Sequence, residues 1–285
     1  MTIAVTGATG HFGRHAVEAL LRSGVPANEI VATGRRTEVL SDLADRGVLV
    51  RRADYDDEAS LREAFTGVDR LLLVSGSEVG QRERQHTNVI AAAKAAGVRF
   101  IAYTSITRAD TSRLLLAAEH RATEQALAAS GIPVALLRNS WYLENYTGQL
   151  PTYTQHGIAG AARDGKVSAA ARADYAQAAA AVVGAEDGHA GAVYELGGAP
   201  FGMTELAEAV STVTGQQVRY TDLPVEQYQA VLVAAGLPAA VAQVYADGDR
   251  GIADGELLVD GADLEKLLGR TATSLLDAFT QASRS

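Results

Sequence analysis

The chain has 285 residues, no cysteine, and 25 basic against 34 acidic side chains, which gives a formal net charge of −9. Disulfides, thiolate catalysis and cysteine-ligated metals are therefore excluded. The acidic balance argues against nucleic acid as a partner, since a polyanion binder needs a basic surface. No apolar run reaches the roughly 18 residues of a membrane-spanning helix, so we expect a cytoplasmic protein without integral membrane contact; a homo-oligomer is compatible with these numbers.

The chain opens with a buried-strand pattern at Ile3 to Val5 that runs into glycines at Gly7, Gly10 and Gly13. An apolar helix pattern follows to Leu21. In a Rossmann unit such glycines form the tight turn, allow the backbone to approach a pyrophosphate, and let the helix pack on the strand. The segment thus predicts a dinucleotide site that includes Thr9, His11 and Phe12; the alternative is a purely structural turn.

The second predicted strand, Glu29 to Thr33, ends at Gly34, Arg35 and Arg36 rather than at an acid. An acid at this point would bind the ribose hydroxyls of NAD, whereas an arginine can pair with the 2′-phosphate of NADPH. Arg35 therefore favours NADPH, with NADH as a weaker possibility. The alternative is that both arginines are solvated residues at the start of a helix.

Strand and helix patterns alternate along the first half of the chain, as in a doubly wound parallel sheet. We predict an α/β, Rossmann-type domain over residues 1–150, completed by about 171–198, and a small C-terminal, mostly helical lobe over 199–285, with a loop at 151–170. Further strands are expected at 48–51, 71–74, 100–104, 134–137, 193–196 and near 218–220, and helices at 39–45, 59–65, 85–96, 114–129 and 175–183.

Ligands of open α/β sheets lie beyond the carboxyl ends of the strands. Polar and aromatic residues follow four of the predicted strands, and their shared position makes them candidates for cofactor contact. They are Asp54 and Tyr55, then Ser75, Gly76 and Ser77, then Thr104 and Ser105, and finally Asn139.

The proton relay of ordinary short-chain dehydrogenases, Tyr-x-x-x-Lys after a serine, is missing. Ser105 occupies the place of the serine, but His120 and Glu124 stand at the spacing of the tyrosine and lysine. His120 is the candidate proton donor, with a packed or surface histidine as the alternative. Without the relay, the sequence favours an acceptor that needs little acid catalysis.

An ordered series of motifs supports a more specific assignment. It runs through VTGATGHFG from Val5, ADYDD from Ala53, LLLVSGSEVGQR from Leu71, HTNVIAAAKAAGV from His86, FIAYTSITRADTS from Phe100, AEH from Ala118, LLRNSWYLENY from Leu136, DGK from Asp164 and ARADYA from Ala171. Over nearly its whole length the chain resembles the type 2 NAD(P)H:quinone oxidoreductases of the NmrA-like, atypical short-chain dehydrogenase group. His11 departs from the glutamine that these proteins often carry there.

The resemblance implies NADPH binding and direct hydride transfer to a quinone, without a flavin. Because the sequence has no cysteine and no clustered histidines, we also expect no metal. Trp141, Tyr142 and Asn145 are candidates for holding a planar acceptor, and the alternative for Trp141 is core packing. Two other functions stay open: a redox sensor that binds the dinucleotide without turnover, and a reductase of dyes or other planar conjugated acceptors. Elsewhere, Arg172 and Asp174 are expected to pair with each other.

Overall fold

The computed structural model describes residues 1–284. Its main sheet is parallel, with seven strands in the order β3-β2-β1-β4-β5-β6-β9, so the predicted doubly wound sheet is confirmed. The strands are β1 (Ile3–Val5), β2 (Ile30–Gly34), β3 (Leu49–Arg52), β4 (Arg70–Leu73), β5 (Phe100–Ile106), β6 (Val134–Asn139) and β9 (Val193–Leu196). The strand order reverses between β1 and β4, and this is the point where open α/β sheets bind ligands.

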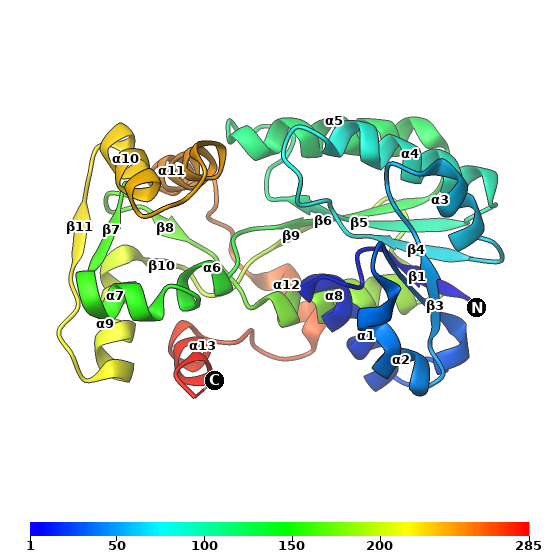
Figure 1. Ribbon diagram of the computed structural model, residues 1–285, viewed down its shortest axis with the longest axis horizontal. Helices are drawn as coiled ribbons and strands as arrows, with labels where there is room; N and C mark the ends of the chain where they lie inside the picture. Colours follow the sequence, from blue (N-terminus) through cyan, green and yellow to red (C-terminus); the bar gives the residue numbers. More distant parts are fainter. Residues whose placement is uncertain (285) are drawn as a thin grey trace.

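Helices cover both faces of the sheet (Figure 1). One face carries α1 (His11–Arg22), α8 (Arg172–Gly184) and α12 (Ala262–Leu268), and the other carries α3 (Glu58–Ala64), α4 (Arg82–Ala95) and α5 (Leu115–Ser130). Helix α1 buries Phe12, Ala16, Val17 and Leu20, which recur at helical spacing along one side. Three short helices flank β2 and β3 along the chain: Ala27–Glu29, Thr37–Leu40 and α2 (Ser41–Asp45).

The remaining elements form a lobe with its own apolar core, at the left of Figure 1. Phe201, Leu206, Val210, Leu257 and Phe279 are among its buried side chains. The lobe contains α6 (Glu144–Thr147), α7 (Leu150–His156), β7 (Ile158–Gly160), β8 (Lys166–Val167), β10 (Phe201–Gly202), α9 (Met203–Thr214), β11 (Tyr220–Asp222), α10 (Val225–Ala234), α11 (Ala239–Ala253) and α13 (Leu275–Ala282).

Residues 151–170 differ from the predicted loop. They include α7, a strand β7 that pairs in parallel with β11, and a strand β8 that pairs antiparallel with β10. The register joins Ile158 to Tyr220. Strands of two or three residues leave no periodic signal of their own, and their partners lie far away in the chain, so local pattern could not reveal them.

Helix α12 also departs from the predicted division of the chain. Its buried side chains Leu264 and Leu268 belong to the core of the nucleotide-binding domain, where α12 packs against α8 and β9. The chain thus returns from the lobe to the main sheet before α13 goes back to the lobe. None of the helices within residues 1–284 is long and apolar enough to cross a membrane.

Candidate active site

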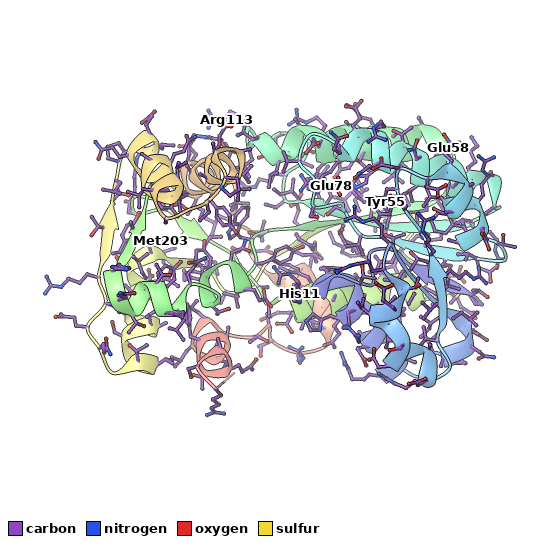
Figure 2. The ribbon with its side chains drawn as sticks, in the orientation of Figure 1. His11, Tyr55, Glu58, Glu78, Arg113 and Met203 are labelled. Atoms are coloured by element: carbon purple, nitrogen blue, oxygen red, sulfur yellow. The ribbon has the colours of Figure 1, made fainter. Side chains whose placement is uncertain are left out.

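A groove of about 560 Å³ lies along the carboxyl ends of β1, β2, β3 and β4. Figure 2 labels His11 at the start of α1, Tyr55 after β3 and Glu78 after β4, which are three of its lining residues. Most of the predicted cofactor residues line it: Gly7, Thr9, Gly10, His11, Phe12, Gly13, Arg35, Asp54, Tyr55, Ser75, Gly76 and Ser77.

The glycine turn has the geometry that a pyrophosphate site requires. Gly7 has φ of +61°, and a Cβ on Gly13 would lie 2.4 Å from the Gly7 carbonyl oxygen. Gly10 is the N-cap of α1 and lacks a side-chain cap. The first N–H groups of α1 therefore begin at the groove, where they can donate to an anion.

The end of β2 presents two exposed arginines to the groove, Arg35 and Arg36. The Arg35 guanidinium pairs with the Glu78 carboxylate at 3.0 Å. Glu78 comes from the segment after β4, so this ion pair joins two sides of the groove. Gly34 is also needed here, because a Cβ on it would lie 2.4 Å from the Thr9 methyl group.

Tyr55 and Asp54 form the flank of the groove after β3. The Tyr55 hydroxyl donates to the Val74 carbonyl at 2.8 Å and lies 2.6 Å from Thr6 Oγ1. Burial raises the pKa of this phenol, which therefore stays neutral. The ring is fixed as a wall of the groove, and a fixed aromatic wall suits a planar base such as adenine.

The segment Ser75–Ser77 is held to the sheet by buried side chains behind it. Ser75 N–H donates to Thr104 Oγ1 at 2.8 Å, and Gly76 N–H donates to His86 Nε2 at 3.0 Å. Because Nε2 accepts, the ring carries its proton on Nδ1, which lies 2.9 Å from Thr123 Oγ1. Burial lowers the pKa of His86 to about 3, so the acceptor nitrogen is free at neutral pH.

Arg82 fixes the same segment from its other side. Its Nε donates to the Gly76 carbonyl at 2.5 Å, and its guanidinium pairs with Glu119 at 3.1 Å in a largely buried ion pair. Glu119 also accepts from Gly80 N–H at 2.7 Å. Both hydrogen-bonding groups of the Gly76 peptide are thus occupied, and its position beside the groove is set.

Asn139 ends β6 with a buried amide whose nitrogen and oxygen have no hydrogen-bond partner. A buried amide without partners is costly, but Asn139 does not line the groove, contrary to its expected cofactor contact. Tyr142, whose phenol lies near this amide, lines the groove together with Arg172. The glycine turn and the arginines after β2 together fit a dinucleotide with a 2′-phosphate.

Thr104 and Ser105 lie within β5 and do not line the groove, contrary to their expected cofactor contact. Thr104 acts behind the groove, on Ser75. The Ser105 hydroxyl donates to Glu124 at 2.6 Å, and Glu124 pairs with Arg138 at 2.7 Å. Ser105 and Glu124 are thereby committed to an internal ion-pair network.

His120 does not occupy the position of a proton donor. It is buried on α5, and its Nδ1 lies 2.7 Å from the Tyr103 hydroxyl. Burial, with smaller effects of Arg82 and His86, holds its pKa well below the usual value. A neutral imidazole hydrogen-bonded inside the core cannot serve the groove as a general acid, so the expected role of His120 is corrected.

The three predicted acceptor residues separate in space. Tyr142 lines the groove, and its ring lies under the Arg172 guanidinium at 4.6 Å. Trp141 points into the lobe, where its ring meets that of Tyr245 edge-on at 6.3 Å. Asn145 lies on α6. Neighbouring residues in extended chain point to opposite sides, which explains why Trp141 and Tyr142 diverge.

The expected pairing of Arg172 with Asp174 is wrong. Buried Asp174 pairs with Arg270 at 2.6 Å and accepts from Thr273 N–H at 2.7 Å, while Arg172 packs on Tyr142. Their separation of two residues in a helix places them on different sides. Sequence reasoning therefore missed Arg172 as a groove residue.

Sequence reasoning also did not predict four other lining residues of the groove: Gly34, Glu78, Arg82 and Gln85. Glu78 and Arg82 lie in the motif from Leu71, and Gln85 follows it. Their closeness in sequence to Ser75–Ser77 could have indicated that they line the groove. Among residues 1–284 no group of histidine, aspartate and glutamate side chains could hold a metal ion.

Comparison with known proteins agrees with this geometry. The NmrA-like family model matches residues 1–277. The chain belongs to the NmrA-like family. It is 50% identical over 280 residues to quinone oxidoreductase 2 of Escherichia coli, covering 98% of this chain and 97% of that protein.

Two solved structures are also similar over nearly the whole chain. The NADPH complex of the NADPH-dependent quinone oxidoreductase from Escherichia coli matches with a TM-score of 0.95 and 49% identity, covering 98% of this chain and 99% of the other. The NADP(H) complex of triphenylmethane reductase from Citrobacter sp. matches with a TM-score of 0.93 and 38% identity, covering 99% and 100%. The fold and its groove are thus those of NADP(H)-binding reductases.

Proposed function

We propose that this chain is an NADPH-dependent oxidoreductase that passes hydride directly to a quinone, without a flavin. The observation that carries the proposal is the end of β2, where Arg35 and Arg36 line the groove in place of an acid. The 50% identity to quinone oxidoreductase 2 supports the choice of acceptor. We place the reaction in the cytoplasm.

We assign the parts of the groove to the parts of the cofactor by their chemistry. The glycine turn and the start of α1 bind the pyrophosphate, and Arg35 binds the 2′-phosphate through charge-assisted hydrogen bonds. Tyr55 flanks the adenine, and Ser75–Ser77 lies against the nicotinamide ribose. When bound, NADPH supplies a hydride, so these residues serve to orient the donor toward the acceptor.

The surroundings of α5 explain why the acceptor should be a quinone rather than a simple ketone. Ser105 and Glu124 belong to an ion-pair network with Arg138, and His120 is neutral and buried. A simple ketone needs a proton donor in the transition state. A quinone becomes aromatic as it takes up hydride, so it depends less on such a donor.

A second candidate is reduction of planar conjugated dyes, which the 38% identity to triphenylmethane reductase favours. A third is an NADP(H) sensor without turnover. Steady-state NADPH oxidation with 1,4-benzoquinone, menadione and malachite green separates the three. Quinone turnover well above dye turnover supports the proposal, dye turnover above quinone turnover favours the second candidate, and NADPH binding without any turnover contradicts both reductase functions.

A further inference from the structure

The lobe contains a half-buried carboxyl that the nucleotide groove does not use. Asp249 lies on α11, and its Oδ2 accepts from Ala161 N–H at 2.7 Å. This bond joins α11 to the segment after β7. No contact in the described part of the chain pairs Asp249 with a cation, although Arg250 follows it, because Arg250 is engaged with Asp247, Asp254 and Glu256.

Four phenols from different elements surround Asp249, and we call them the tyrosine cluster. Burial raises the pKa of each of these phenols and the Asp249 carboxylate raises it further, and a Cβ on Gly160 would lie 2.7 Å from Asp249 Oδ2 and 3.0 Å from the Tyr220 ring. The members are Tyr146 on α6, Tyr153 on α7, Tyr220 on β11 and Tyr228 on α10. Convergence of four separate elements on one carboxyl is a feature of a built site rather than of one helix surface.

One member of the tyrosine cluster has a buried hydroxyl that lacks a partner. Tyr146 is 7% exposed, and its hydroxyl is buried without a hydrogen bond. Its ring packs edge-on against Phe201 at 5.7 Å. A buried hydroxyl without a partner costs free energy that a phenylalanine would not, so its presence points to a ligand oxygen.

Trp141 connects the tyrosine cluster to the carboxyl edge of the main sheet. It follows Asn139 by two residues, meets the Tyr245 ring edge-on, and packs against Gly248, where a Cβ would lie 3.3 Å from the indole. Tyr245 and Asp249 are four residues apart on α11 and share a face. Trp141 therefore lies between the end of β6 and the face of α11 that carries Tyr245 and Asp249.

We propose that the acceptor binds beside Trp141, with the Tyr146 hydroxyl and the protonated Asp249 carboxyl donating to its oxygen atoms and Asp249 supplying the proton of reduction. The proposal rests on the proposed function and names its acceptor site. Asp249 is then a catalytic residue in the lobe, and its contribution is modest because a quinone depends less on a proton donor than a simple ketone does.

The charge environment supports a protonated carboxyl near neutral pH. Burial raises the pKa of Asp249 to about 7; the Ala161 N–H opposes this shift and Asp222 on β11 adds to it. The phenols on α6, α7 and α10 are those of Tyr146, Tyr153 and Tyr228, and burial raises the pKa of each, so they are neutral. An acid with a pKa near the working pH is well placed for proton transfer.

The step balances. The acceptor gains two electrons and one hydrogen as hydride from NADPH, and the O–H bond of Asp249 breaks as its proton passes to the reduced oxygen. The Asp249 carboxylate then regains a proton from water. The sum is quinone, NADPH and one proton giving hydroquinone and NADP⁺.

The test uses the full chain and two readouts. Trp141 is the only tryptophan, so quenching of its fluorescence by menadione reports binding at this site without NADPH. Asp249→Asn keeps an oxygen for Ala161 N–H but cannot donate a proton, and Tyr146→Phe removes only the unpartnered hydroxyl. Glu226→Gln, an exposed carboxyl on α10, is the matched control.

We expect wild-type kcat/KM for menadione to fall about tenfold between pH 6 and pH 8, and Asp249→Asn to remove this dependence. We also expect Asp249→Asn and Tyr146→Phe to weaken menadione binding about fivefold or more, with the thermal stability of Tyr146→Phe unchanged or raised. The proposal is overturned if both variants show the same pH profile and bind menadione as tightly as the wild type. If wild type reduces no quinone, the proposed function fails, and the fluorescence titration still decides whether this site binds menadione.

Discussion

The Arg35 guanidinium and the Glu78 carboxylate meet at 3.0 Å across the nucleotide groove. Arg35 follows β2 and Glu78 follows β4, so one ion pair links the predicted 2′-phosphate site to the segment that we propose borders the nicotinamide ribose. Gln85 Nε2 bridges Glu78 and Asp56 behind this pair. An anionic phosphate and the Glu78 carboxylate therefore compete for the same cation.

Replacement of Arg35 should change cofactor preference. Arg35→Ala removes a charged hydrogen bond to the 2′-phosphate, so NADPH binding should weaken by roughly 1.5–3 kcal/mol while NADH binding stays nearly constant. Isothermal titration with both cofactors measures this difference. The control is Arg62→Ala on α3, because Arg62 has the same side-chain exposure of 63%. Equal losses for NADPH and NADH would rule out this role of Arg35.

Replacement of Glu78 should change NADPH affinity in the opposite direction. Glu78→Gln keeps the shape but removes the charge that competes for Arg35, so NADPH should bind more tightly by up to about 1 kcal/mol, the scale of an exposed ion pair. The gain should shrink at high salt. In the Arg35→Ala background the same substitution should have no effect, and a persisting gain there would contradict the competition.

The glycine turn offers a matched pair of variants. Gly13→Ala places a Cβ 2.4 Å from the Gly7 carbonyl, whereas Gly10→Ala meets nothing closer than 3.4 Å. We expect Gly13→Ala to lower the thermal unfolding midpoint. Gly10→Ala should leave the midpoint near wild type and weaken NADPH binding, because its methyl group occupies the phosphate approach. The reverse order of effects would show that the turn has only a structural role.

Two buried histidines should make the fold sensitive to acid. The pKa of His86 is lowered to about 3 and that of His120 well below its usual value, while both titrate near 6.5 when unfolded. Below pH 6.5 these histidines bind protons in the unfolded chain but not in the folded chain. The stabilising contribution of their neutral forms is therefore complete above pH 6.5 and is lost as pH falls toward 3. Each histidine should cost about 1.4 kcal/mol per pH unit below 6.5.

Urea unfolding between pH 7 and pH 4 measures this slope. His120→Ala should flatten it and lower stability at pH 7, since Tyr103 loses its partner. Its effect on kcat should stay below the roughly hundredfold expected for a general acid. A larger loss of kcat with unchanged stability would restore His120 as a proton donor.

Much of the main domain could be predicted from the sequence, for identifiable reasons. Buried strands such as Ile3–Val5 are continuous apolar runs, and Gly7, Gly10 and Gly13 mark the turn by residue type. These signals are local. They therefore predicted the groove at the carboxyl edge and most of its lining residues.

The failures concern side-chain direction and distant partners. His120 and Glu124 have the spacing of a catalytic pair, but only packing reveals that Tyr103 and Arg138 engage them. Likewise Asp174 pairs with Arg270, which lies 96 residues further along the chain. Asp249 was not among the predicted site residues, because a carboxylate in a helix is ordinarily solvated. Its partial burial arises from elements of the lobe that share no sequence pattern.

The most direct test of the central claim is NADPH consumption by purified protein with menadione, together with the absorbance spectrum of the supernatant after denaturation. We predict sustained turnover, with one hydroquinone formed per NADPH oxidised, no flavin released and no stimulation by added FAD. Turnover that depends on added or bound flavin, or NADPH binding with no quinone reduction, would contradict the account.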